Sequence, residues 1–377
     1  MTRRRSSATW LAAAYAALVV YASLYPFVPW NWPPGLGWPN LIYLPWPRYW
    51  GRFDVWANAV GYFPLGLLLA VALARSAVRH WAAYVLAALG LCLLSLSMEV
   101  LQHALPRRVP SSADWVLNCT GAALGMVVGC SVARLGWLAP WEGWRERWFV
   151  PDSAGALALV ALWPLALLFP TAVPLGVGYL LPRLQPLVVL ALQDTPWALA
   201  SAGEAALEAV PLAWPPELEL LTTALGLLSP CLLVLSVARR GWRRGLLVAV
   251  LMGLGLGGLL AAALFNFGPE HAWAWVTPTV WPGFALGGAL ALVAACLSRR
   301  ACAAWGLVSL SALIALVSQA PADPFLRQTM QAWEQGRFVN MYGLAQWLGL
   351  CWPFAALTWL MWGVTQAESR AQTASRP

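Results

Sequence analysis

The sequence predicts an all-α fold, a polytopic transmembrane helix bundle of about ten spans with both termini in the cytoplasm. Of its 377 residues, 60% are hydrophobic and only 10% are charged, whereas a soluble domain carries about 25% charged residues. The chain also contains 26 Trp, a residue that anchors membrane helices at the level of the lipid headgroups. A chain so poor in charge cannot cover a water-facing surface, which excludes soluble enzymes and disordered proteins.

The apolar runs follow one another with the length that a membrane span requires, about 20 residues. The first run, 9–27, follows three Arg and ends without a small-residue cleavage site, so we expect an uncleaved span rather than a signal peptide. Nine further runs of similar size come after it: 54–74, 81–101, 114–133, 153–170, 217–238, 245–266, 277–297, 301–319 and 341–364.

One segment interrupts this series. Residues 171–216 contain seven Pro together with three acidic residues, Asp194, Glu204 and Glu208. We interpret the segment as a long outside loop with interfacial or re-entrant pieces, with room for two more short spans.

The arginines indicate the orientation of the spans. The chain has 23 basic residues, all of them Arg, and with the N-terminus inside 16 of them fall in cytoplasmic loops and 7 outside. This bias agrees with the positive-inside rule from loop to loop. The net charge of +8 is explained by topology, so we expect no nucleic-acid partner.

A charged segment divides the chain. Between residues 134 and 152, four Trp recur at spacings of three and four residues beside Glu and Arg, a pattern typical of a helix lying in the membrane interface. We therefore predict a four-helix membrane domain over residues 1–133, an interfacial linker over 134–152, and a six-helix membrane domain over 153–377.

Polar residues collect at the ends of three predicted spans. Helical spacing places Asp54 with Asn58 and Asp114 with Asn118, and the predicted topology places all of the polar residues at the outer ends of their helices. A carboxylate at a helix C-terminus meets the negative end of the helix dipole, so Glu99 requires a partner, either Arg107, Arg108 or a bound cation. We predict one outward-facing ligand site formed by Asp54, Asn58, Glu99, Gln102, His103, Arg108, Asp114 and Asn118.

These motifs resemble the VanZ-like family over about residues 10–133. The resemblance rests on Glu99-x-x-Gln102, on Arg108 six residues later, and on Asp114-x-x-x-Asn118 followed by Gly121 and Gly125. Upstream, Asp54-x-x-x-Asn58 and the run from Tyr62 to Gly66 also match, except that many members carry His where this chain has Asn58. Small residues spaced by four also predict that this span packs closely against another helix.

The resemblance implies a multi-pass protein of the bacterial inner membrane that is linked to resistance to teicoplanin-type glycopeptides. The residues favour binding or handling of a cell-envelope lipid or glycan precursor, because an Arg guanidinium binds phosphate well. Two alternatives stay open: a membrane enzyme that uses Glu99 and Asp114, and a transporter or a structural scaffold for an envelope complex.

Other cofactors and partners have no sequence signal. The seven Cys lie in or beside apolar runs without a CxxC motif, so we interpret them as small packing residues. We predict no metal site and no cofactor, and membrane lipids as partners.

Overall fold

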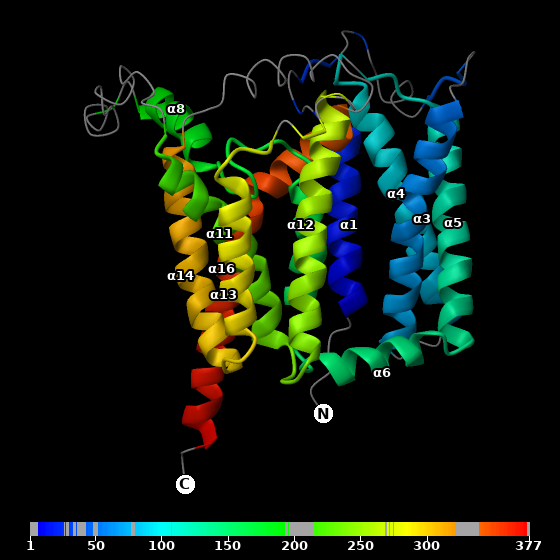
Figure 1. Cartoon of the computed structure of the whole chain (residues 1–377). Helices are drawn as coiled ribbons and strands as arrows, with labels where there is room; N and C mark the ends of the chain where they lie inside the picture. The colour runs from blue at the N-terminus through cyan, green and yellow to red at the C-terminus, as the bar shows by residue number, and fades with distance from the viewer. Residues whose placement is uncertain are drawn as a thin grey trace. The chain divides into compact units, whose positions relative to one another are not determined.

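The structure, a computed structural model, is helical throughout the part of the chain that it describes (Figure 1). The described residues are 7–25, 27, 30–32, 35, 43–47, 52–76, 80–106, 108–192, 195, 214–267, 270, 272–273, 275–320 and 339–374. Within them the only extended pairing is an isolated antiparallel bridge between Phe149 and Ala238. The predicted all-α fold is confirmed.

The chain divides into two compact units, Met1–Arg145 and Glu146–Pro377. Unit 1 contains α1 (Ser7–Leu24), α3 (Arg52–Arg75), α4 (Trp81–Gln102) and α5 (Ser112–Arg134). The division falls inside α6 (Leu138–Trp148), a helix within the predicted interfacial linker. Unit 2 contains the remaining helices, and each unit is described by itself below.

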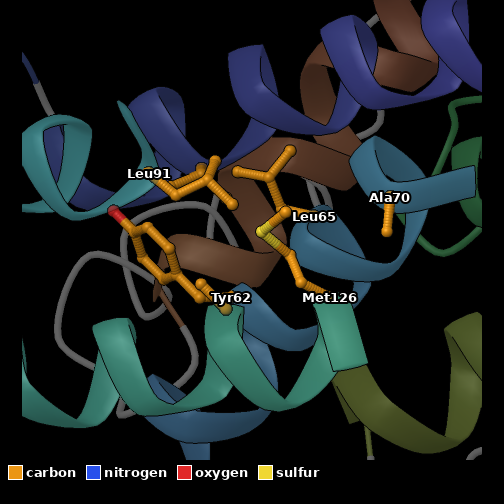
Figure 2. Close-up of a cluster of buried hydrophobic side chains, with 7 residues drawn as sticks. Tyr62, Leu65, Ala70, Leu91 and Met126 are labelled. Atoms are coloured by element: carbon orange, nitrogen blue, oxygen red, sulfur yellow. The ribbon is translucent and has the colours of Figure 1, made fainter. Parts of the chain in front are cut away.

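In unit 1, α3 packs against α1, α4 and α5, and α4 also packs against α1 and α5. The core between these helices is apolar, and Figure 2 shows the ring of Tyr62 at one end of it, with its hydroxyl oxygen directed away from Ala70 and Met126. The buried members of this core are Val19, Tyr62, Leu65, Ala70, Leu91, Ala122 and Met126.

Helices α3 and α5 are in backbone contact. A Cβ atom added at Gly121 would overlap the carbonyl oxygen of Ala59, and one added at Gly125 would overlap that of Phe63. The partners on both helices advance by four residues in the same direction, so the two helices run parallel. The sequence predicted that the span with Gly121 and Gly125, now α5, packs closely against another helix. This prediction is confirmed, and the other helix is α3.

Unit 2 is built around α11 (Pro216–Val237), which contacts α7 (Ala154–Ala166), α12 (Arg243–Phe267), α13 (Val280–Ala294) and α14 (Arg299–Gln319). The last helix, α16 (Val339–Ala374), packs against α7 and α14. Of the apolar window of α11, 72% is buried inside the protein, against 39% or less in the other long apolar helices. Helix α11 is therefore a core helix of this unit.

A buried segment without regular structure follows α7. Leu175 is fully buried and adopts φ 62°, a left-handed conformation that is costly for a residue with a branched side chain. The Gly178 amide donates to the Gly349 carbonyl at 2.8 Å. That carbonyl lacks its helical partner because Pro353, four residues later in α16, has no N–H group. The segment thus satisfies a backbone group that a proline has left open.

A buried arginine joins three helix ends in unit 2. Arg244 is 1% exposed, and its guanidinium donates to the carbonyls of Leu235, Ala295 and Leu297, at the C-terminal ends of α11 and α13. Helix C-termini carry unpaired carbonyls and a negative partial charge. The sequence analysis used Arg244 only to predict membrane topology, but in the structure Arg244 also links the ends of these helices.

Each of the ten predicted runs lies on a helix, with some changes in length. The run 153–170 is helical only over Ala154–Ala166, and the run 277–297 only over Val280–Ala294. Six of the described helices are long and apolar enough to cross a membrane, and the rest of the apolar helices are shorter or incompletely described. The chain is a multi-pass membrane protein, while the count of ten and the orientation of the termini stay predictions.

The proline-rich segment 171–216 is more ordered than the predicted loop over part of its length. It includes α8 (Leu181–Leu192), a 12-residue helix that begins with Pro182 in its first turn. Proline is tolerated in the first turn of a helix because the N–H groups there have no helical partner. Residues 196–213 lie outside the described residues.

Candidate functional site

Four helix ends of unit 1 meet at one end of the bundle. Helices α1 and α4 finish there, and α3 and α5 begin there (Figure 1). Backbone hydrogen bonds bind the connecting segments to this end, from Asn31 to Ala104 at 2.8 Å and from Ser112 to Pro45 at 3.1 Å. We call this region the Glu99 end, after the buried acidic residue that it contains.

Glu99 lies in the last turn of α4 and is 3% exposed. Its Oε2 atom accepts a hydrogen bond from the backbone amide of Ser111 at 2.9 Å. Ser111 is the N-cap of α5, so the carboxylate lies at the positive end of a neighbouring helix dipole. This contact compensates the unfavourable position that Glu99 occupies on its own helix.

Arg108 and Gln102 hold the site against the end of α1. The Arg108 Nη2 atom donates to the carbonyls of Ala22 at 2.8 Å and Tyr25 at 3.2 Å. The Gln102 side-chain amide donates to the carbonyl of Ser23 at 3.1 Å. Both side chains thereby pair the carbonyls that a helix C-terminus leaves open.

The expected contact between Glu99 and Arg108 takes a different form in the structure. No ion pair joins the two side chains; the partner of the carboxylate is the Ser111 amide, and Arg108 attracts it only at longer range. Of the three partners predicted for Glu99, Arg108 is excluded as a direct ion-pair partner because its guanidinium binds the carbonyls at the end of α1 instead; Arg107 lies outside the described residues, and a bound cation stays a prediction. Burial lowers the pKa of Arg108, and the nearby carboxylate of Glu99 raises it in part.

His103 terminates α4 rather than assisting Glu99. Its Nδ1 atom lies 3.2 Å from the backbone carbonyls of Glu99 and Val100. A carbonyl oxygen only accepts hydrogen bonds, so Nδ1 is the donor in this contact. The imidazole therefore caps its own helix, and the structure does not bring it into hydrogen bonding with a carboxylate of the site.

The first two turns of α5 carry the other predicted residues. The backbone amide of Asp114 donates to the Ser111 hydroxyl at 3.4 Å, an N-cap contact. The Asp114 side chain is half-buried and repels the Glu99 carboxylate electrostatically. One turn further, the buried Asn118 donates through Nδ2 to the hydroxyl of Ser95 on α4 at 3.0 Å.

Two buried polar atoms beneath Glu99 have no hydrogen-bond partner among the described residues. They are the Tyr62 hydroxyl, on a residue 4% exposed, and the Asn118 Oδ1 atom, on a residue 5% exposed. Ser23, Ser95 and Glu99 are among the polar groups around the Tyr62 hydroxyl. The polar region therefore continues inward from the Glu99 end.

The remaining predicted residues lie on α3. Asn58 is half-buried in the second turn of this helix. Asp54 lies in the first turn, and its side chain is outside the described residues, as is Arg107. The structure thus brings Glu99, Gln102, His103, Arg108, Asp114 and Asn118 to one end of the bundle.

Sequence reasoning missed two members of the site. Ser95 lies four residues before Glu99, so helical spacing alone places it on the same face of α4. Ser111 contributes through its backbone amide as well as its hydroxyl. The first could have been found from the spacing, whereas a backbone donor leaves no signal in residue type.

The chemistry available at the Glu99 end is that of oxygen ligands and one guanidinium. No three side chains of His, Cys, Asp or Glu gather within the ranges that the structure describes. Arg108 uses only Nη2 for the carbonyls of α1, and its Nε and Nη1 atoms have no hydrogen-bond partner among these residues. Such donors suit an oxyanion, and the carboxylates and amides suit hydroxyl or amino groups.

Comparison with known proteins identifies a relative for unit 1 only. Residues 7–134 match the family model described as VanZ/LLP1. No curated protein and no solved structure matches the chain significantly. The first third of this membrane protein is therefore similar to the VanZ/LLP1 family, and that third contains every residue of the candidate site.

Proposed function

We propose that unit 1 binds the polar headgroup of a cell-envelope lipid or glycan precursor at the Glu99 end, in the bacterial inner membrane. The observation that carries this proposal is the position of Arg108. Its guanidinium is fixed to α1 by two backbone carbonyls and keeps further N–H groups unpaired among the described residues. A preorganised guanidinium at the end of a helix bundle suits the phosphate of a headgroup.

The surrounding groups support recognition of a neutral or amino-bearing part of the same ligand. Glu99 and Asp114 supply carboxylates, and Gln102 and Asn118 supply amides, all within one short stretch of chain. Carboxylates and amides accept hydrogen bonds from sugar hydroxyls and amines. A headgroup that combines a phosphate with hydroxyl or amino groups is the best complement to this set.

The test is lipid mass spectrometry of the purified full-length protein. We expect Arg108→Ala to reduce the co-purifying phosphate-bearing lipid several-fold, because water replaces a fixed charge poorly. Arg240→Ala is the matched control, since Arg240 is exposed in unit 2. Equal lipid content in the wild type and both variants would contradict the proposal.

The competing enzyme function is separated by Glu99→Gln. If Glu99 only shapes the site, this variant retains lipid binding, because a Gln oxygen still accepts from the Ser111 amide. If Glu99 is a general base, conversion of the bound lipid stops while binding persists. Comparing lipid content with the appearance of a modified lipid distinguishes the two functions.

The similarity to VanZ/LLP1 supports a link to teicoplanin-type glycopeptides as part of the same proposal. Such drugs act on envelope precursors, so a protein that sequesters a precursor changes susceptibility. Expression in a susceptible host should raise the inhibitory concentration, and Arg108→Ala should abolish the increase. No increase with the wild-type protein would remove this part of the proposal and leave lipid binding to be judged by mass spectrometry.

A further inference from the structure

A polar layer lies roughly 9–15 Å inside unit 1, measured along each helix from its end at 1.5 Å per residue. It joins three helices, because Tyr62 comes from α3, Ser95 from α4 and Asn118 from α5. All three residues are buried, at 4%, 0% and 5% exposure. The hydrogen bond from Asn118 to Ser95 pairs only part of this layer, and Tyr62 OH and Asn118 Oδ1 are left unpaired among the described residues.

Unpaired polar atoms are costly in a membrane helix bundle. A buried hydroxyl or amide without a partner loses the hydrogen bonds that it made in water, and buried polar groups in membrane spans often mark functional sites. These two atoms lie on different helices and are connected through Ser95, which lies one turn before Glu99 on α4: Asn118 donates to the Ser95 hydroxyl, and the Tyr62 hydroxyl interacts with Ser95 and Glu99. Two unpaired polar atoms in one buried layer indicate that the layer binds a ligand or ion.

The buried carboxylate of Glu99 indicates which kind of ligand this layer binds. Glu99 supplies the buried carboxylate of this region, and Arg108 donates to backbone carbonyls at the end of α1 instead of pairing with it. Within the described part of the chain Glu99 forms no ion pair, and its hydrogen bond there is donated by the neutral backbone amide of Ser111. A buried carboxylate requires neutralisation by a cation or by a proton.

We propose that this layer, together with Glu99, forms a site for one monovalent metal cation, with Na⁺ as the best candidate. The four contributing groups are all oxygens, which hard cations prefer over nitrogen or sulfur, and the single carboxylate of Glu99 supplies one negative charge to match one positive charge. In membrane proteins such cation sites are formed where side-chain and backbone oxygens meet between helices. The oxygen donors are those of Tyr62, Ser95, Glu99 and Asn118.

This site shares Glu99 and Asn118 with the proposed lipid site but differs from it in depth and in ligand. The cation layer lies deeper than Arg108 and uses groups that a headgroup phosphate does not need. The inference therefore does not require that the protein bind an envelope lipid. A cation response without lipid selectivity would overturn the proposed function and leave the cation site standing.

The experiment measures thermal unfolding of the purified full-length protein in detergent, in NaCl, KCl and choline chloride at equal ionic strength. We expect Na⁺ to raise the Tm saturably over choline. Asn118→Leu and Tyr62→Phe should each weaken the apparent Na⁺ affinity by roughly tenfold or more. Equal Tm values for the wild type in Na⁺ and choline would overturn the proposal.

Asn266→Leu is the matched control. Asn266 in unit 2 also has an unpaired Oδ1 atom, while its Nδ2 atom donates to backbone carbonyls. We expect this variant to lose some stability but to keep the full Na⁺ response. Loss of the response in Asn266→Leu would show that Na⁺ acts elsewhere and would overturn the assignment.

Asn118→Asp tests the site even where Asn118→Leu fails to fold. It keeps the side-chain volume and adds a second carboxylate, so the site should change preference from Na⁺ toward Ca²⁺, which takes carboxylate oxygens. Stabilisation by acidic buffer alone, with no response to any metal cation, would mean that Glu99 is neutralised by a proton, and would overturn the proposal.

Discussion

Helices α3 and α5 in unit 1 and helices α11 and α13 in unit 2 pack by the same device. In both pairs the helices run parallel, and glycines on the second helix meet carbonyl oxygens of the first at four-residue intervals. In unit 2 a Cβ at Gly283 would lie 2.7 Å from the Leu220 carbonyl oxygen, and one at Gly287 would lie 2.5 Å from that of Ala224. An antiparallel helix, α4 or α12, separates the members of each pair in the sequence.

The polar ends of the two pairs differ. In unit 1 a buried carboxylate is bound by a backbone amide, and an arginine is fixed nearby. In unit 2 the first turn of α11 contains Glu219, whose carboxylate accepts a hydrogen bond from the Thr277 hydroxyl at 2.6 Å. The comparison shows that one packing solution supports two different polar environments, so the chemistry depends on the few residues at the helix ends and not on the packing.

The largest effect should come from filling the glycine contacts. Gly125→Leu places a side chain into the backbone of α3, where nothing flexible can move aside, and should cost roughly 3 kcal/mol or more. Gly287→Leu should cost about 1–3 kcal/mol, since its carbonyl neighbour is less close. Thermal unfolding of the purified protein measures both.

Glycines that face open space provide the controls. Gly90 in α4 and Gly253 in α12 have no atom within 4 Å of an added Cβ. Replacing either with Ala should be neutral or stabilise by about 0.5–1 kcal/mol, because Gly is a poor helix former. If Gly125→Leu behaved like these controls, the shared packing device would be refuted.

The next prediction compares the two arginines that bind carbonyls at helix ends, Arg244 and Arg108. Arg244→Met leaves three backbone carbonyls without their donor and should destabilise the protein by about 2–3 kcal/mol. Arg244→Lys should restore only part of the loss, since an ammonium lacks the planar fork. The measurement is the Tm shift, and Arg240→Met, at an exposed position, should shift it little.

Arg108→Met should cost less, about 1–2 kcal/mol, because Arg108 is only half-buried and binds two carbonyls. Comparing the stability lost in Arg108→Met with that lost in Arg244→Met tests whether Arg108 is mainly structural. A purely structural Arg108 would show only the Tm shift, whereas a ligand-binding Arg108 would also lose lipid. A loss as large as that of Arg244→Met would count against a binding role.

The smallest effect concerns the polar contact between α11 and α14. The hydroxyls of Ser229 and Ser309 lie 2.8 Å apart, and both residues are buried. A double-mutant cycle with Ser229→Ala and Ser309→Ala should give a coupling of about 0.6 kcal/mol, the average for such bonds in membrane helices. A coupling near zero would show that this hydrogen bond adds nothing to the packing of α11 against α14.

Much of the fold could be predicted because membrane helices follow simple composition rules. All ten predicted runs lie on helices, and Gly121 and Gly125 indicated the close contact correctly. The ends were less certain: α7 is shorter than its apolar run, because the segment after Ala166 turns into irregular structure that other helices bury. Hydropathy measures burial, and a buried loop is as apolar as a buried helix.

The meeting of the helix ends that carry the candidate residues could be predicted, but their contacts could not. The spacing of Glu99, Gln102, Asp114 and Asn118 correctly brought their helix ends together. The contact from the Ser111 amide to Glu99 was missed, because side-chain charges are visible in a sequence and backbone amides are not. The role of Arg244 was missed for a related reason, since its partners are carbonyls of helices distant in sequence.

The bond between Gly178 and Gly349 has a consequence for biosynthesis. The two residues are 171 positions apart (349 − 178). At a synthesis rate of 5–20 residues per second, roughly 10–30 s pass between the emergence of the two residues from the ribosome. Throughout this interval the Gly178 amide, in the irregular segment after α7, lacks the Gly349 carbonyl that accepts its hydrogen bond in the folded protein. Unit 2 therefore matures only when its last helix arrives, and a chain truncated before α16 should be a substrate for membrane proteases.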